Sequence, residues 1–364
     1  MDKSGANKKP SFGEKGINTV RWILNRLLLS DNFVLYLCVL FFLALLPFVP
    51  RMGSLGNLGQ ISSNMWPLLA LVIGQMFVLI LGGIDLSQTS IMAITSVIGA
   101  LIMTSELDPN LFQNNPLWGV VLSENGGPLA GSILAVPMAV LAMLIVGSLI
   151  GLLNGLAVAR FKMPPFMVTL ISMMFFSGLA IYITRSENVI HLPTGYIAIG
   201  NDKLWFIPYS FFVAGLLTVT AHLILTRTLL GRWFYAVGKN IRTSMISGIP
   251  VSRVLILGYV FSGFCAAAGS ILYSARLGGG RPTLGQTQLL DVIAAAVIGG
   301  ISLFGGKGKV LWAVFGVLFF TLLSNALDML NLSFYTVNIV KGSVIIMAAL
   351  IDVARNKILS QTKI

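Results

Sequence analysis

The feature that most constrains this chain is a series of long apolar segments recurring from residue 33 to residue 352. Most run for about 17 to 25 residues, enough to cross a hydrocarbon core of roughly 30 Å as a helix. Inside lipid every backbone polar group must be paired within the structure, so such runs form helices. We count ten of them, at 33–49, 64–82, 88–104, 132–158, 166–184, 206–226, 252–274, 289–304, 310–328 and 335–352. The sequence therefore predicts an all-α, polytopic membrane bundle of about ten transmembrane helices. The eighth run is short and flanked by glycine, which predicts a broken or partial span.

Composition excludes a soluble globule. The chain is 56% hydrophobic and 10% charged, with a mean hydropathy of +0.89, which leaves too little polar surface to cover a water-facing fold. Both cysteines, Cys38 and Cys265, fall inside predicted spans, so we expect neither a disulfide framework nor a metal site.

The distribution of basic residues predicts the orientation. A net charge of +12 is compatible with nucleic-acid binding, but the cations are spread between apolar runs rather than gathered on one domain. With a cytoplasmic N-terminus, 18 of the 24 Lys and Arg residues lie on the cytoplasmic side, as the positive-inside rule requires. We therefore expect both termini in the cytoplasm, no nucleic-acid partner, a polar tail at 1–32, a membrane domain at 33–353 and a short tail at 354–364.

Motifs for chemistry are missing. The stretch "GGKGKVL" at 305–311 has neither the spacing nor the final hydroxyl of a P-loop, which needs backbone N–H groups, Lys and Ser/Thr around the phosphates. There is no HExxH, no Cys/His cluster and no paired carboxylate, and we give His191 and His222 no role. We expect a chain that is not an enzyme and binds no metal.

"LGGIDLSQTS" at 81–90 places a carboxylate among apolar spans. We expect Gly82 and Gly83 to end one helix at the cytoplasmic side, and Asp85 and Ser87 to cap the next. This makes Asp85 a structural anchor at a helix break. The alternative is a direct role in transport, because a charge at membrane depth is by default a functional hypothesis.

Other expected helix boundaries follow from similar reasoning. Asp291 should cap the short eighth helix on the outer side, and two prolines in "ARFKMPPF" should start the fifth helix, because proline fits a first turn. The residues assigned to these boundaries are Pro164, Pro165, Phe166, Asp291, Gly299 and Gly300. In "GSLIGLLNG" the glycines at 147, 151 and 155 share one helix face and predict close helix packing.

Four segments together resemble one family. "GGIDLSQTSIMAI", "GLLNGLAVARFKMPPFMVTLISMMFFSGLA", "GRWFYAVGKNIRTSMISGIPVSR" and "LLDVIAAAVIGGISLFGGKGKV" closely resemble, in order and spacing, segments of sugar-type ABC importer permeases, the ribose, xylose and galactoside group. The resemblance covers about residues 60–353. It implies a bacterial inner-membrane permease that translocates, by alternating access, a sugar delivered by an extracytoplasmic binding protein.

The resemblance also implies partners. A second permease subunit, identical or paralogous, would pair with this one among membrane lipids, and a two-site ABC ATPase would bind below and hold ATP and Mg, so that this chain binds no cofactor. The cytoplasmic loop at 227–250 would be the coupling segment that docks on the ATPase. Its assigned residues are Gly231, Arg232, Gly238, Asn240, Ser247 and Gly248. The loop departs from the family after Asn240, where acidic and small residues are usual, and a basic loop lying on an anionic membrane surface is the alternative.

Sugar recognition uses planar polar groups for hydroxyls and aromatic faces for C–H surfaces. The candidates within the spans are Asn64, Gln75, Asn154, Phe175, Phe176 and Asn325. An ion-coupled secondary transporter is the rival, but it usually needs ionisable groups or unwound helices at the midplane. Asp85, Asp291 and Asp328 are expected near span ends instead.

Overall fold

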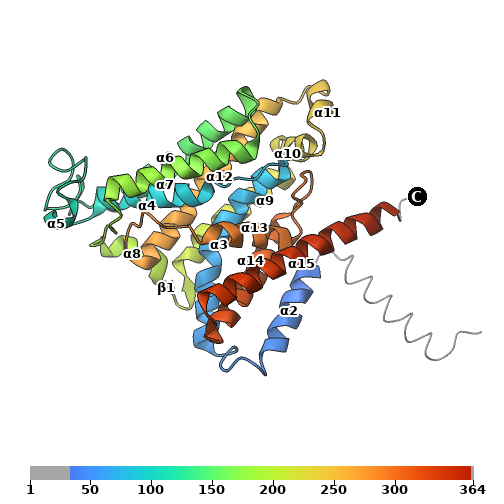
Figure 1. Cartoon of the computed structure of the whole chain (residues 1–364), viewed down its shortest axis with the longest axis horizontal. Helices are drawn as coiled ribbons and strands as arrows, with labels where there is room; N and C mark the ends of the chain where they lie inside the picture. Colours follow the sequence, from blue (N-terminus) through green and yellow to red (C-terminus); the bar gives the residue numbers. More distant parts are fainter. Residues whose placement is uncertain (1–32, 362–364) are drawn as a thin grey trace, which may run out of the picture.

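The structure is a computed structural model that describes residues 33–361 (Figure 1). Each of the ten apolar runs contains a helix, as predicted. These helices are α2 Phe33–Leu45, α3 Leu55–Ile80, α4 Gln88–Met103, α6 Ala135–Arg160, α7 Pro165–Thr184, α9 Tyr209–Arg227, α12 Val251–Leu277, α13 Gln288–Gly299, α14 Val310–Met329 and α15 Phe334–Gln361. The expected tail at 1–32 lies outside the described residues, and α15 continues into the expected C-terminal tail.

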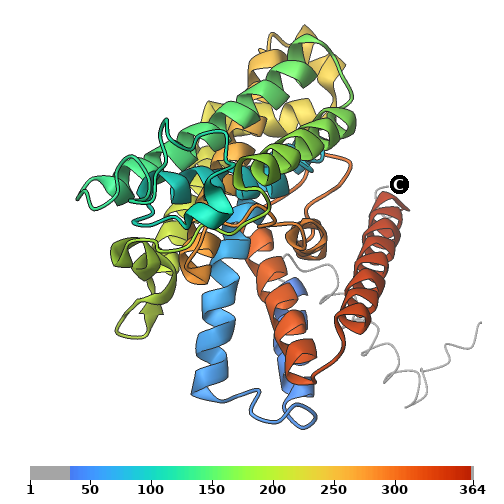
Figure 2. The ribbon, with the colours of Figure 1, turned by 60° about the vertical axis from the view of Figure 1, so that its left-hand side comes forward.

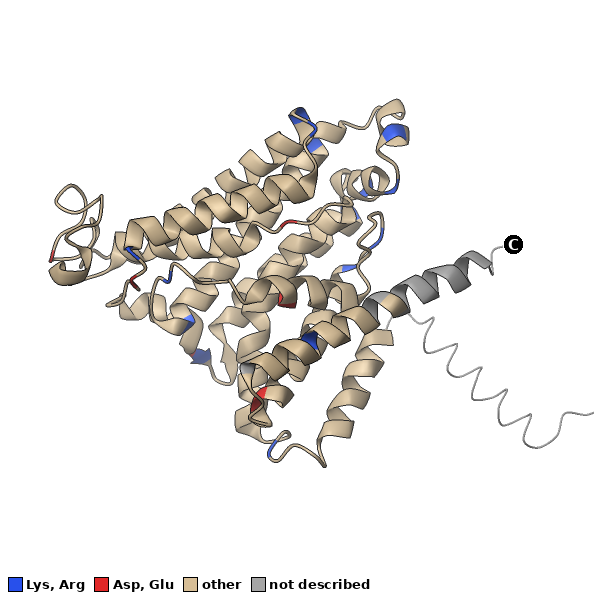
Figure 3. Cartoon of the chain, in the orientation of Figure 1, with Lys and Arg blue, Asp and Glu red and all other residues tan. Residues whose placement is uncertain are grey.

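Short elements lie at the two ends of the bundle. The outer end carries α5 Pro109–Phe112, α8 Thr194–Asn201 and an antiparallel hairpin of β1 Lys203–Leu204 and β2 Ile207–Pro208. The opposite end carries α10 Leu229–Lys239 and α11 Ile241–Ile246. Figure 3 shows Lys and Arg on α10, α11 and the loops beside them, so this is the cytoplasmic end.

Six helices within the described residues are long and apolar enough to cross a membrane, namely α3, α6, α7, α9, α12 and α14. These six helices differ in the share of their residues that is buried. In the most apolar part of α3 83% of the residues are buried, against 22% in α7 and in α9. The centre of the bundle is therefore α3, while α7 and α9 present side chains to lipid. Helix α15 packs against α13 and α14 at the edge of the bundle (Figure 2).

The α6–α12 contact is built from glycine. A Cβ on Gly155 would lie 2.8 Å from the Cα of Ile256, and Cβ atoms on Gly147 and Gly151 would collide with the carbonyl oxygens of Gly263 and Tyr259. Lipid gives helices no hydrophobic reason to associate, so such close backbone approach supplies the dispersion contacts that hold them together. The predicted packing face is confirmed.

Candidate functional site: a helix break and the cytoplasmic helices

The chain breaks between α3 and α4 and turns back into the bundle. Helix α3 ends at Ile80, Gly82 takes a left-handed turn at φ +80, and α4 begins at Gln88. The side-chain Nε2 of Gln88 donates to the carbonyl oxygen of Leu71 at 3.2 Å. Leu71 lies nine residues before the end of α3, which is about 14 Å along the helix axis. The irregular segment 82–87 thus lies inside the bundle, and our placement of Asp85 at the cytoplasmic edge of the bundle is wrong.

Asp85 is buried, with 1% of its surface exposed. Its Oδ1 accepts hydrogen bonds from the backbone N–H of Ser87 at 2.9 Å and from the Ser87 hydroxyl at 2.5 Å. Its Oδ2 accepts from the hydroxyl of Ser262, on α12, at 2.6 Å. Both oxygens of a buried carboxylate are therefore bound by hydroxyl and amide donors, as burial of such a group demands.

The predicted capping is only partly correct. Ser87 occupies the position before α4, but its side chain makes no capping bond to that helix. Asp85 instead accepts from an N–H that precedes the helix, in a local turn typical of Asp. The Ser87 hydroxyl also accepts a bond from the Asn154 amide, on α6, at 2.8 Å. The carboxylate therefore joins α6 and α12 to the break more than it caps α4.

Two more side chains hold the break from other helices. With its amide oriented to satisfy both groups, Gln75 donates to the backbone oxygen of Asp85 at 3.0 Å and accepts from its N–H at 3.2 Å. The Thr169 hydroxyl, on α7, donates to the carbonyl oxygen of Ile84 at 3.2 Å. Gln75, Asp85, Ser87, Asn154 and Ser262 form what we call the Asp85 cluster. It fixes an irregular segment whose backbone groups lack a helix to pair them.

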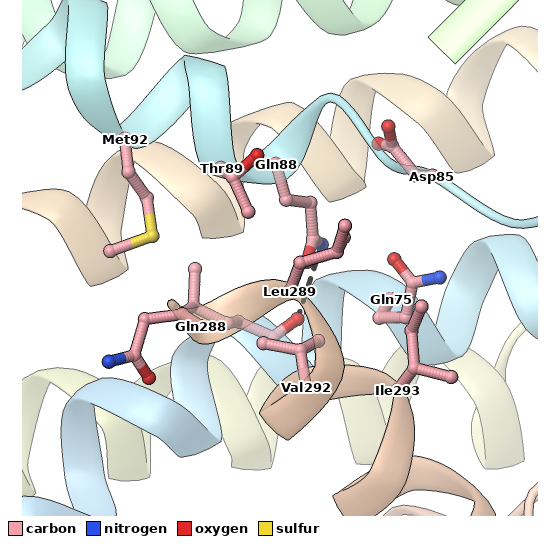
Figure 4. Close-up of a pocket in the computed structure, with 10 residues that line it drawn as sticks. Gln75, Asp85, Gln88, Thr89, Met92, Gln288, Leu289, Val292 and Ile293 are labelled. Atoms are coloured by element: carbon pink, nitrogen blue, oxygen red, sulfur yellow. Dashed lines mark hydrogen bonds between the residues drawn. The ribbon is translucent and has the colours of Figure 1, made fainter. Parts of the chain in front are cut away.

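A narrow cavity lies beside this cluster between α3, α4 and α13 (Figure 4). It is too tight to hold a water molecule. The Asp85 carboxylate points away from Gln75 and Ile293, toward the hydroxyls that bind it. The cavity is lined by Leu71, Gln75, Asp85, Gln88, Thr89, Met92, Gln288, Leu289, Val292 and Ile293. The side-chain oxygen of Gln88 is buried with no hydrogen-bond partner, so this wall retains an unused acceptor.

The remaining pathway candidates lie elsewhere. Asn325, on α14, pairs with Asn57, on α3, through two reciprocal bonds of 3.0 and 2.9 Å at the outer end. Phe175 and Phe176 contact each other edge to face on α7, with Phe175 exposed, and Asn64 is half-buried on α3. Of the six candidates, Gln75 lines the narrow cavity beside the Asp85 cluster, and the other five do not line it.

The coupling segment forms two capped helices. The Thr228 hydroxyl accepts from the N–H of Gly231 at 3.2 Å at the start of α10, and Asn240 Oδ1 accepts from the N–H of Thr243 at 2.9 Å at the start of α11. Gly248, in the turn after α11, has φ +78 and open space around it. The exposed positions of α11 and its flanks are Asn240, Ile241, Arg242, Thr243, Met245, Ile246, Ser247 and Gly248. Arg232 is exposed on α10.

Gly231 and Gly238 contact this chain's own bundle, so our assignment of both to the ATPase-docking surface is corrected. A Cβ on Gly231 would collide with carbonyl oxygens of α9, and one on Gly238 with the carbonyl oxygen of Ile80. Their lack of a side chain lets α10 lie directly against α9 and the end of α3.

Helix α10 therefore touches the residues that flank the break. The Phe234 ring packs edge-on against Phe77 of α3, with centroids 5.3 Å apart. The N–H of Gly306 donates to the oxygen of Ile80 at 2.8 Å, and a Cβ on Gly305 would lie 3.0 Å from the Cα of Gly82. A displacement of α10 must move either the end of α3 or the loop after α13.

Asp291 does not cap the partial helix as predicted. It lies inside the first turn of α13, and its two oxygens accept from the Lys341 ammonium, on α15, at 3.1 and 2.9 Å. At the C-terminal end of α13 the predicted boundary is confirmed. The helix ends at Gly299, and Gly300 adopts φ +100. The twelve residues of α13 confirm a partial span.

The fifth predicted helix starts where the prolines indicate. Helix α7 begins at Pro165, and Pro164 precedes it in an extended conformation. Phe166, on the first turn, is exposed.

Sequence reasoning missed Ser262, Gln88 and Thr169. The run "DLSQTS" offered a signal for Gln88, since five of its six residues are polar between two apolar spans. Ser262 and Thr169 are single hydroxyls within apolar helices and carry no such pattern. Among the described residues, no group of three or more His, Cys, Asp or Glu side chains is placed to hold a metal ion.

The chain is similar in sequence to several import permeases. The chain is 32% identical to the ribose import permease protein of Haemophilus influenzae over 289 residues, which are 78% of this chain and 80% of that one. It is 29% identical to the galactose/methyl galactoside import permease protein of the same organism over 335 residues, 89% and 94% of the two chains. The D-allose transport system permease protein of Escherichia coli matches at 28% over 279 residues, 77% and 78% of the two chains. No solved structure matches.

A family description covers most of the membrane domain. Residues 57–349 match the family described as branched-chain amino acid transport system / permease component. This span runs from the first turns of α3 into α15, and so contains the helix break, the cytoplasmic helices and the partial helix. The chain belongs to this family of transport-system permease components.

Proposed function

We propose that this chain is the membrane-spanning permease subunit of an ATP-driven importer for a sugar, in a bacterial inner membrane. The relatives named for ribose, galactose and allose support the substrate class. The observation that carries the mechanism is the direct packing of α10 on the end of α3, beside the break. The relatives give no support to an ion-coupled carrier.

The partners follow from the family. Permease components of this kind are transport subunits that work with a separate ATPase and a binding protein. In our proposal, ATP and Mg bind to that ATPase, and two copies of this chain form the membrane pore. Helix α11 is the docking element, because Ile241, Met245 and Ile246 are exposed on it at the cytoplasmic end, where a soluble protein can cover them.

In this mechanism the ATPase pushes α10 and α11 when it closes around ATP. Because α10 packs on Phe77 and Ile80, the push reaches the end of α3 and the irregular segment 82–87. The Asp85 cluster holds that segment in one of its two positions, and rearrangement against α13 opens the closed cavity. In this mechanism the break has two arrangements, and both the ATPase and the solute shift the equilibrium between them.

The cavity lining favours a sugar over an amino acid. Gln75, Gln88, Thr89 and Gln288 offer neutral amide and hydroxyl groups, which match sugar hydroxyls as donors and acceptors. A zwitterionic amino acid would need charged partners for its carboxylate and ammonium groups. The Asp85 carboxylate is engaged by serine hydroxyls instead, and the unpartnered oxygen of Gln88 is suited to accept from a hydroxyl.

Substitution of Gly248 tests the coupling. We expect Gly248→Trp in the reconstituted complex of permease, ATPase and binding protein to retain ATP hydrolysis while sugar uptake falls at least about tenfold, within the usual range of coupling free energies. The physical reason is the φ of +78, which L side chains rarely adopt. Gly215→Trp, on the open face of α9, is the matched control and should leave uptake near normal. Unchanged coupling in Gly248→Trp would count against the assignment of this segment.

A further inference from the structure

The loop 278–287, between α12 and α13, runs from the outer half of the bundle toward its middle. At one end the Arg281 N–H donates to the Ser96 hydroxyl at 3.2 Å, and that hydroxyl donates to the Arg281 carbonyl oxygen at 3.0 Å. At the other end a Cβ on Gly285 would lie 3.0 Å from the carbonyl oxygen of Thr89. Ser96 and Thr89 are seven residues apart on α4, which is about 10 Å along the helix axis. The loop covers this depth without forming a helix.

The loop ends at the depth at which α4 begins. Gln88, the first residue of α4, bonds to Leu71, about 14 Å from the cytoplasmic end of α3 and so near the middle of a hydrocarbon core of roughly 30 Å. Helix α13 starts at this level with Gln288 and returns to the cytoplasmic end over twelve residues, about 18 Å. Figure 4 shows Leu289 of α13 opposite Thr89 of α4. Helices α4 and α13 thus both begin near mid-membrane and run in opposite directions.

Both helix starts leave hydrogen-bonding groups for a ligand. The first N–H groups of a helix have no partner within it, and neither Ser87 before α4 nor Thr287 before α13 caps them with its side chain. Gln88 is 2% exposed, and its side-chain oxygen has no hydrogen-bond partner among the described residues. Its side chain lines the same cavity as Gln288. A buried acceptor beside two helix starts at mid-membrane is an arrangement suited to a polar solute.

One face of the loop is exposed at this depth. Leu284 is buried and anchors the loop in the bundle, whereas Thr283, Gln286 and Thr287 are exposed. Lipid offers no partner to an irregular backbone or to hydroxyl and amide groups. Such segments therefore occur at membrane depth only where protein covers them or where they line a water-filled path. The sequence from 282 to 290 contains no charged residue.

We propose that this exposed face lines a water-filled path through the membrane, and that Thr283, Gln286 and Thr287 bind the hydroxyl groups of the passing sugar. Hydroxyl and amide side chains both donate to and accept from such groups, and the uncharged loop has no group that would select an ion. The identity of the solute rests on the proposed function, whereas the presence of water at this face does not.

Cysteine labelling tests the path. Thr283→Cys and Thr287→Cys are made in the full chain, which is reconstituted in proteoliposomes with its ATPase and binding protein, with and without ATP. The two native cysteines are buried, so the unmodified chain gives the background. We expect a charged, membrane-impermeant methanethiosulfonate reagent to label both variants in at least one nucleotide state. Leu216→Cys, at an exposed position in the middle of lipid-facing α9, is the matched control. It should react at least about tenfold more slowly, because hydrocarbon excludes the charged reagent.

Sugar protection tests the binding role. Ribose, galactose or allose, whichever the complex imports, should slow the labelling of Thr287→Cys at least about fivefold at several times its Kd. Thr287→Val keeps the shape of the side chain and removes the hydroxyl, and we expect it to lower uptake about fivefold, the effect of one neutral hydrogen bond. Thr220→Val, at an exposed position of α9, should leave uptake unchanged.

Three results would overturn the proposal. If neither loop cysteine reacts in either nucleotide state, protein covers the loop and no water reaches it. If Leu216→Cys reacts as fast as the loop cysteines, the labelling does not report a path. If no imported sugar slows the labelling and Thr287→Val imports normally, the solute passes elsewhere. A complex that is labelled at the loop but imports none of the three sugars supports the water-filled path and contradicts the proposed function, so the two failures are distinguishable.

Discussion

Among the described residues, Asp85 and Asp291 are carboxylates within the bundle, and the chain stabilises them in different ways. Asp85, in the irregular segment between α3 and α4, is bound by two serine hydroxyls and a backbone N–H. Asp291, inside the regular helix α13, is bound by the ammonium of Lys341. The first arrangement uses neutral donors from two parts of the chain, Ser87 and Ser262, while the second uses one opposite charge.

The difference reflects what each carboxylate has to hold. An ion pair neutralises Asp291 at the edge of the bundle, where α15 contacts α13 and α14, and both partners keep some exposure, 14% and 16%. Neutral donors at Asp85 leave the charge in place but tie the break to α6 and α12. The cytoplasmic helices reach the break through Ile80, so the hydroxyl-bound carboxylate is the one connected to the proposed energy input. Three variants sharpen this contrast.

The largest effect is expected from Asp85→Ala. Removal of the carboxylate leaves the hydroxyls of Ser87 and Ser262 and one N–H short of a partner in a buried site, at about 1–3 kcal/mol for each unsatisfied group. We expect a clear loss of thermal stability, followed by intrinsic tryptophan fluorescence, and loss of ATP-driven uptake in proteoliposomes. Asp85→Asn should retain much of both, because its oxygen still accepts from Ser87 and its amide nitrogen can donate to Ser262. A stable Asp85→Asn protein without uptake would show that the charge itself takes part in transport.

Lys341→Met should have the next largest effect. It leaves Asp291 with its charge and without its cation, and breaking a buried pair in this way costs about 3–5 kcal/mol; partial exposure lowers our expectation to about 2 kcal/mol. The double variant Asp291→Leu/Lys341→Met should be more stable than Lys341→Met alone, since neither charge remains. Thermal unfolding of the four proteins in a double-mutant cycle measures the interaction. If the double variant is the least stable, then the pair holds α15 in a way that apolar packing does not replace.

The sequence predicted the regular parts of the molecule well. Ten apolar runs gave ten helices, Pro165 marked the start of α7, and Gly299 and Gly300 marked the end of α13. These features depend on local chemistry: hydrocarbon thickness sets helix length, and backbone conformational limits set helix ends. The expected orientation rests on charge, because the distribution of cations is visible in the sequence, and it stays a prediction.

The site was less predictable because it depends on long-range contacts. Asp85 was recognised as unusual, but its depth is set by the return of residues 82–87 into the bundle, which the contacts of Gln88 with Leu71 and of Gln75 with Asp85 reveal. Ser262 contacts Asp85 across 177 positions in the chain. The pairing of Lys341 with Asp291 depends on the docking of α15 against α13. The sequence shows the two glycines of α10, but it does not show that they face this chain's own bundle.

The smallest effect is expected from Ser262→Ala, and it separates the two carboxylates most directly. The change removes one hydroxyl from α12 and leaves Oδ2 of Asp85 without its donor, at a cost of about 1–2 kcal/mol. A purely structural role of Ser262 lowers stability alone, whereas a role in holding the break in one position also changes transport. We expect ATP hydrolysis to rise relative to uptake, measured as the number of ATP molecules consumed per sugar.

Ser270→Ala is the matched control on the same helix. The buried Ser270 hydroxyl donates to the carbonyl oxygen of Met92 at 2.8 Å, so its removal should lower stability by a similar amount and leave the ratio of ATP to sugar unchanged. Equal ratios in both variants would mean that the Asp85 cluster supports the fold and does not gate the pathway.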